Sequence, residues 1–107
     1  MRMDPILYLQ DWYAAQCDGD WEHQFGVAID TLDNPGWVVR IDLTDTPLQG
    51  QQYDGAVVDR SESDWYRCSV EDRVFKGAGG PLNLADILIE FDLFTKRGGR
   101  AGDGSGT

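Results

Sequence analysis

The residues best suited to chemistry are concentrated in residues 17–23 of the chain. This segment carries three carboxylates and the single histidine of the sequence: Asp18, Asp20, Glu22 and His23. Carboxylates at alternate positions are typical of calcium-binding loops, but such loops also need further oxygen ligands downstream and a closing bidentate glutamate, which this segment lacks. A zinc site would lack a second histidine. These residue types at these spacings therefore give a metal site little support.

The same segment could form a small enzyme site. The imidazole of His23, beside Asp20 or Glu22, is suited to general acid–base catalysis. Cys17 and His23 could act as a thiol nucleophile and its base, but one local pair without a third orienting group is weak support. The alternative is structural, with the polar atoms capping the end of the preceding helix while Trp21 fills the core. We favour the structural interpretation and keep an enzyme, or a metal- or ligand-binding domain, as the alternative.

A glycine-rich segment, residues 77–80, precedes an expected helix and could hold a phosphate on its backbone N–H groups. It lacks the lysine and the Ser/Thr of a P-loop. A turn from strand to helix that requires positive φ angles explains the glycines equally well. We therefore predict a turn and no phosphate site.

Acidic residues are also frequent in residues 42–64, where six carboxylates accompany a single basic residue, Arg60. Two large aromatic residues lie within or beside this run. Aromatic side chains anchor protein interfaces, and charge sets the association rate, so the run could bind a partner protein. A merely solvated surface is an equal alternative. The predicted partner-binding residues are Asp42, Asp45, Tyr53, Asp54, Asp59, Glu62, Asp64 and Trp65.

Local signals predict the elements that position these residues. Asp4 followed by Pro5 is a helix start, and helical spacing then predicts a helix over about residues 5–16. Its core side would carry Ile6, Leu9 and either Trp12 or Tyr13. Alternation of period two predicts a hairpin around the turn at residues 33–36, placing Trp37 in the core together with Trp21.

Three further strands are predicted near residues 53–59, 65–70 and 74–77, the first two joined by a polar connection. Asn83 should then cap a final helix that ends near residue 95, with Leu82 and Ile87 closing a hydrophobic staple. Because the connections between strands are short, an antiparallel meander is favoured over crossovers. The sequence therefore predicts an α+β domain, a sheet of about five strands with both helices on one face.

The length and composition of the chain indicate one domain. We assign residues 1–96 to it and expect the glycine-rich residues 97–107 to form a flexible tail. The formal net charge is −10, and residues 96–107 contribute +2 of it, which leaves −12 on the rest. Such a charge disfavours nucleic acid and anionic membranes as partners. With no apolar run of about 20 residues and no features of a signal peptide, we expect a cytoplasmic protein with free thiols at Cys17 and Cys68.

Two sets of long strings carry a family likeness. The first set is Trp12-Tyr13, residues 16–23, Gly26-Val27, residues 31–37 and Ile41-Asp42-Leu43. The second set is Asp64-Trp65, Cys68, residues 70–72 and residues 75–80. Together these strings, which cover about residues 5–95, resemble the immunity protein 53 family.

The resemblance implies a small cytoplasmic bacterial protein encoded beside a polymorphic toxin. Such an antitoxin protects the producing cell by binding and blocking its cognate toxin. The resemblance implies no catalytic residue and no cofactor, and it carries over no set of contact residues. From the residues themselves we predict no metal site. We therefore expect an immunity protein that neutralises a toxin by stoichiometric occlusion, and the acidic charge would suit a basic toxin.

Overall fold

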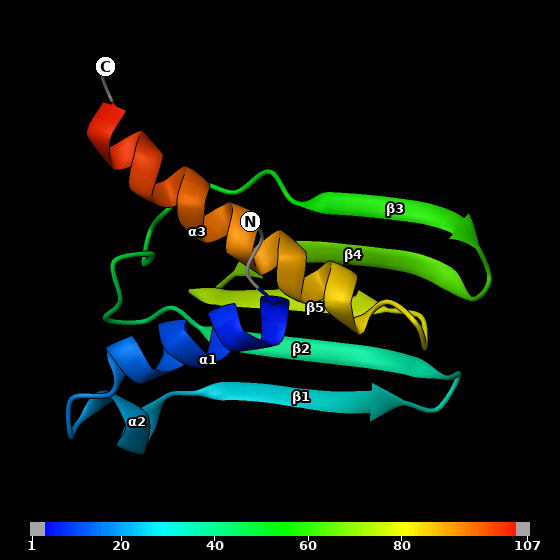
Figure 1. Cartoon of the computed structure of the whole chain (residues 1–107), viewed down its shortest axis with the longest axis horizontal. Helices are drawn as coiled ribbons and strands as arrows, with labels where there is room; N and C mark the ends of the chain where they lie inside the picture. Colours follow the sequence, from blue (N-terminus) through cyan, green and yellow to red (C-terminus); the bar gives the residue numbers. More distant parts are fainter. Residues whose placement is uncertain (1–3, 105–107) are drawn as a thin grey trace.

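A computed structural model describes residues 4–104 of the chain, and the side chains of residues 4–96. Five strands form one antiparallel sheet, and the two long helices lie side by side across one of its faces (Figure 1). The predicted α+β class is confirmed. The elements are α1 (Pro5–Gln16), α2 (Trp21–Gln24), β1 (Val27–Leu32), β2 (Gly36–Asp42), β3 (Ala56–Ser61), β4 (Asp64–Glu71), β5 (Val74–Gly79) and α3 (Leu84–Gly104).

The order of the strands in the sheet is β1-β2-β5-β4-β3, so the prediction of a simple meander is wrong. Three neighbouring pairs do form hairpins, but β2 pairs with β5 instead of β3. The connection over residues 43–55 is long enough to carry the chain from β2 to the far side of the sheet, and β5 then fills the central position. As a result, β1 and β3 are the two edge strands.

The first helix begins and ends where the sequence predicts. The Asp4 carboxylate accepts the N–H of Ile6 at 2.8 Å, which satisfies one of the unpaired donors of the first turn. Its buried side is narrower than predicted: Leu9 is buried and Trp12 half-buried, whereas Ile6 is 60% and Tyr13 38% exposed. The helix therefore carries apolar residues on a side that the core does not cover.

Two predicted strand boundaries are corrected. β3 begins at Ala56, three positions later than predicted, because Tyr53 leaves the sheet and packs its ring 4.9 Å from that of Phe94. β5 continues two positions further than predicted, to Gly79. The glycines at its end do not break the strand. Instead, their missing side chains let α3 pack closely on it.

The final helix differs at both ends from the prediction. It continues to Gly104 and does not end near residue 95, since glycines cost a helix only about 1 kcal/mol each and no proline follows. The flexible tail over residues 97–107 stays a prediction, and residues 105–107 lie outside the described residues. At its start, the hydrophobic staple is wrong, because Leu82 is 88% exposed while Ile87 is fully buried.

Asn83 precedes α3, but the hydrogen bonds of its side chain differ from those of the predicted cap, because its Oδ1 does not bind an N–H of the helix. Its Oδ1 accepts the N–H of Trp65 at 3.3 Å, and its Nδ2 donates to the carboxylates of Asp64 at 3.0 Å and Asp86 at 2.8 Å. Asn83 is itself buried. One side chain therefore fixes the start of α3 against the start of β4.

The core lies between the sheet and the two long helices. It is rich in aromatic rings: Phe75 of β5 stands 5.2 Å from Phe91 and 5.9 Å from Phe94, both of α3, measured between ring centroids. The largest fully buried side chains are Phe75, Phe91, Phe94, Ile41, Leu43, Ile87 and Val39. The face of the sheet turned away from the helices carries most of the basic residues of the strands, namely Arg40, Arg67 and Lys76.

Candidate functional site

The carboxylates of residues 17–23 bind backbone groups of the same segment. Asp18 accepts the N–H groups of Asp20 and Trp21, both at 3.0 Å. Glu22 accepts those of Asp18 at 3.0 Å and Gly19 at 2.9 Å. Hydrogen bonds from backbone N–H groups lower the pKa of both carboxyl groups. For Asp18 the largest effect comes from the N–H of Trp21 and the next from that of Asp20. For Glu22 the largest effect comes from its own N–H, and the N–H groups of Asp18 and Gly19 add to it. This reciprocal arrangement caps the start of α2, and not the end of α1 as the sequence predicted.

The other reactive groups of this segment do not converge. Cys17 donates its thiol to the carbonyl of Tyr13 at 3.3 Å, within the last turn of α1, and His23 is exposed. Among residues 4–96, no group of three or more His, Cys, Asp or Glu side chains is placed to hold a metal ion. The segment therefore joins α1 to α2, and its geometry gives no assembled catalytic site.

Both cysteines are free thiols, as predicted, and Cys68 is buried while Cys17 is half-buried. Burial, with a smaller effect of the Glu90 charge, raises the pKa of Cys68 to about 12. A thiol with this pKa is protonated at neutral pH and is a poor nucleophile. Cys68 therefore serves as a small core residue of β4.

Residues 77–80 are not the positive-φ turn that the sequence suggested, and they hold no open cradle for a phosphate. Gly77 and Gly79 lie inside β5 beneath α3. A Cβ on Gly77 would overlap the Cγ2 of Ile87. A Cβ on Gly80 would lie 2.6 Å from the carbonyl oxygen of Ser63 and 2.9 Å from the Oδ1 of Asn83. The glycines permit close packing of a helix on a strand.

The structure divides the predicted partner-binding residues between opposite ends of the sheet. Asp42 ends β2, whereas Asp64 begins β4, and these two strands run in the same direction because each is antiparallel to β5 (Figure 1). We call the residues at the Asp42 end the first acidic group: Asp42, Asp45 and Asp54. We call those around the β3–β4 hairpin the second acidic group: Asp59, Glu62 and Asp64.

Several of these side chains already have partners within the chain. Arg60 binds Asp64 with its Nε at 2.9 Å and its Nη2 at 3.0 Å, and these contacts, with the Asn83 amide, lower the pKa of Asp64. Tyr53 donates its hydroxyl to Glu90 at 2.7 Å and packs on the core. The ring of Trp65 is half-buried, with the guanidinium of Arg67 at 5.4 Å from its centroid.

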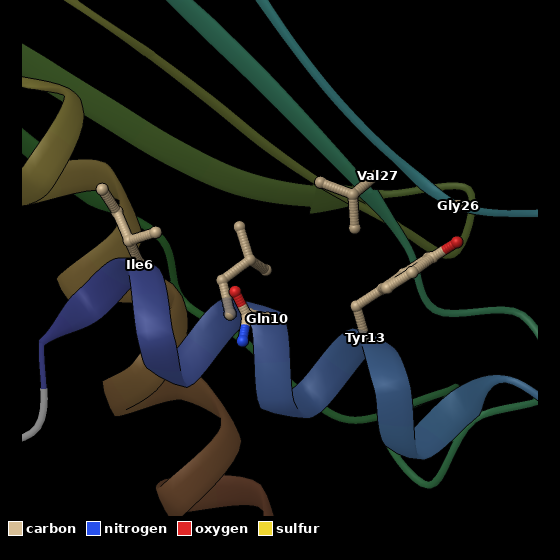
Figure 2. A pocket seen from close by; sticks show the side chains of 6 residues that line it. Ile6, Gln10, Tyr13, Gly26 and Val27 are labelled. Atoms are coloured by element: carbon tan, nitrogen blue, oxygen red, sulfur yellow. The ribbon is translucent and has the colours of Figure 1, made fainter.

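One surface feature was not predicted, an apolar groove between α1 and the edge strand β1 (Figure 2). Its volume is about 380 Å³, and it is lined by Ile6, Leu9, Gln10, Tyr13, Gly26 and Val27. Ile29, the next helix-facing residue of β1, is 42% exposed. The sequence feature that could have predicted this groove is the composition of α1, because the helix has more apolar residues than a single buried stripe requires.

Comparison with known proteins gives the class of this chain. The family model described as Immunity protein 53 matches residues 6–96, which is nearly the whole of the described domain. This match places the chain among the immunity proteins, a class that is generally not enzymatic and whose partner is a cognate toxin. Within that class, the chain belongs to the immunity protein 53 family, as the resemblance indicated.

Other comparisons add no relatives. No curated protein and no solved structure shows significant similarity to the chain. In the described part of the chain, no helix is both long enough and apolar enough to cross a membrane.

Proposed function

We propose that this protein neutralises its cognate toxin by forming a one-to-one complex that covers the active site or substrate channel of the toxin, in the cytoplasm of the producing cell. Membership of the immunity protein 53 family carries this proposal. The net charge of −10 supports a basic toxin as the partner, because opposite charges steer association. The same charge argues against nucleic acid and anionic membranes.

The alternative of an enzyme that uses Asp18, Asp20, Glu22 and His23 receives no support from the geometry. Two of these carboxylates are occupied in capping α2. A catalytic pair would need a side chain that is held toward an open substrate site. The proposed antitoxin therefore acts by binding, and we expect one copy to be consumed for each toxin molecule.

Titration of the toxin domain encoded by the neighbouring gene tests this directly. Residual toxin activity should fall linearly with added protein and reach its minimum at about one equivalent. His23→Gln should give the same end point, because His23 is exposed and the proposed mechanism needs no proton transfer. Protection at far fewer than one equivalent, lost in a folded His23→Gln variant, would instead show catalysis.

We also propose that the acidic surface, including the two acidic groups, speeds the approach of the toxin. Raising salt from low to physiological concentration should slow association several-fold and change dissociation less, since steering acts at long range and is screened within about 10 Å. Reversal of the exposed Asp59 and Glu62 to lysine should also slow association without lowering the melting temperature.

Stopped-flow fluorescence or surface plasmon resonance would measure both rates. The matched control exchanges the two acids, Asp59→Glu with Glu62→Asp, and preserves the charge. An association rate that is indifferent to salt would refute electrostatic steering. A rate that responds to salt, but not to the reversals, would show that the second acidic group does not face the approaching toxin.

A further inference from the structure

Within the part of the chain that the structure describes, the edge strand β1 presents unpaired backbone groups toward solvent. The N–H of Asp42 donates to the carbonyl of Gly26 at 3.1 Å, so these two opposed residues form a hydrogen-bonded pair of the β1–β2 ladder. In an antiparallel ladder such pairs recur at every second residue, so the N–H and C=O groups of Ala28 and Asp30 also point toward β2. The N–H and C=O groups of the alternate residues, Val27, Ile29 and Thr31, therefore point away from β2. Of these, the N–H of Thr31 is already accepted by the Asp30 carboxylate at 3.1 Å. The free pairing edge is thus formed by Val27 and Ile29.

The other edge strand is protected where β1 is not. β3 carries an irregular register between Asp59 and Ser61, and Arg60 at that point is held by Asp64. Bulges and charged side chains are the usual means by which proteins prevent an edge from pairing with another chain. β1 has no bulge and no lysine, proline or arginine, and its one charged residue, Asp30, accepts the N–H of Thr31 with its carboxylate. This asymmetry singles out β1 as the edge available for pairing.

The apolar groove lies beside the same edge. Val27, whose side chain points toward the helices, lines the groove from β1, and Ile6 and Tyr13 line it from α1 (Figure 2). Ile29, the next residue on the same face of β1, is 42% exposed. A strand added to β1 would place alternate side chains on the helix face of the enlarged sheet, over this groove. Backbone pairing and apolar burial would therefore be satisfied by one extended segment.

The charge around the edge specifies the occupant further. Residues 4–39, which include α1, α2 and β1, contain seven Asp and Glu residues and no Lys or Arg. Arg40 of β2 pairs with Ala28, but it lies on the sheet face turned away from the helices and the groove. A second copy of this chain would bring two such surfaces together, so the charge opposes self-pairing. A basic segment would be attracted to the same surface.

We propose that an extended, basic segment of the cognate toxin adds to β1 as a further strand and inserts alternate apolar side chains into the groove between α1 and β1. This inference rests on the proposed function and specifies the contact that holds the complex. The acidic surface speeds the encounter, whereas the β1 edge slows dissociation.

Two substitutions at Ile29 test the contact against the same toxin domain. Ile29→Pro removes an outward N–H that the β1–β2 ladder does not use, and Ile29→Lys places a cation beside the groove. Each should weaken binding at least about tenfold, mainly through faster dissociation, the loss expected for one or two missing hydrogen bonds or a repelled basic strand. Their matched controls are Thr31→Pro, on the same strand but outside the free edge, and Val57→Lys, on the exposed side of β3. Both controls should bind as the unmodified chain does.

Amide hydrogen exchange measured by NMR gives a second readout. In the free chain, the amides of Val27 and Ile29 should exchange fast and those of Ala28 and Asp30 slowly, and only the first pair should become protected in the complex. Unchanged affinity of folded Ile29→Pro, or continued fast exchange at Val27 and Ile29 in the complex, would overturn strand addition while the proposed function stands. Failure of the unmodified chain to bind the toxin would overturn both. A free chain that dimerises, and becomes monomeric with Ile29→Pro, would assign the edge to a second copy and also overturn the proposal.

Discussion

Replacement of Trp21 by alanine is expected to lower the free energy of unfolding by about 3–5 kcal/mol, the usual cost of removing a large buried aromatic side chain. Trp21 is only 4% exposed. Its ring meets Trp12 edge-on at a centroid distance of 6.1 Å and Tyr13 at 6.0 Å. Its Nε1 donates to the carbonyl of Thr44 at 2.8 Å. The side chain therefore joins α1, α2 and the connection after β2, and its loss would loosen all three.

Urea denaturation followed by circular dichroism measures this loss without relying on tryptophan fluorescence. Trp65→Ala is the matched control, because that ring is half-buried on the sheet face away from the helices. Trp37→Ala should lie between the two: its ring is half-buried, and its Nε1 donates to the carbonyl of Pro81 at 3.0 Å. A Trp21→Ala variant that unfolds at the same urea concentration as the unmodified chain would contradict the packing described here.

The elements that could be predicted from sequence are those set by neighbouring residues. Asp4 and Pro5 fix the start of α1, and alternation on either side of the turn at residues 33–36 fixes the β1–β2 hairpin. The strand order could not be predicted in the same way. Periodicity shows which side of a strand is buried but not which strand lies beside it, so the insertion of β5 between β2 and β4 left no local signal.

The candidate sites also divide into features set by neighbouring residues, which could be predicted, and features set by the arrangement of the strands, which could not. A structural role for Asp18 and Glu22 was the favoured interpretation, because such residue types commonly bind nearby N–H groups. The prediction placed their hydrogen bonds at the end of α1, whereas they lie at the start of α2. The acidic run of residues 42–64 looked like one surface because its members are close in sequence. Asp42 ends β2 and Asp64 begins β4, and β3 carries the chain from one end of the sheet to the other between them, so these neighbours in sequence lie at opposite ends.

The groove beside β1 was missed for a different reason. Ile6 and Tyr13 fit a helical apolar spacing, so Ile6 was placed in the core and Tyr13 was kept as an alternative to Trp12 there. The core uses the side of α1 that carries Leu9 and Trp12, and a sequence pattern cannot say which of two apolar sides packs inward. The exposed edge of β1 likewise depends on the strand order, which only the structure supplies.

Alanine at Gly77 is expected to cost about 1–3 kcal/mol of stability, the usual range for extra atoms in a packed core. Gly77 lies in the central strand β5, directly beneath α3. The added Cβ would overlap the Cγ2 of the fully buried Ile87, and it would also lie 3.5 Å from the Sγ of Cys68. To accommodate the methyl group, α3 would have to move away from the sheet. Gly26→Ala is the matched control, because nothing lies within 4 Å of the corresponding Cβ position.

A double-mutant cycle identifies the cause of this loss. Ile87→Ala alone should destabilise the domain by about 2–5 kcal/mol, since it leaves a cavity under α3. Because the same substitution removes the Cγ2 that the new methyl group would overlap, Gly77→Ala should cost much less in the Ile87→Ala background. The coupling energy should therefore be about 1–3 kcal/mol, within the range known for contacting residues. Strict additivity of the two changes in thermal or urea unfolding would show that the overlap with Ile87 does not cause the loss, and would contradict the close packing of α3 on Gly77 described here.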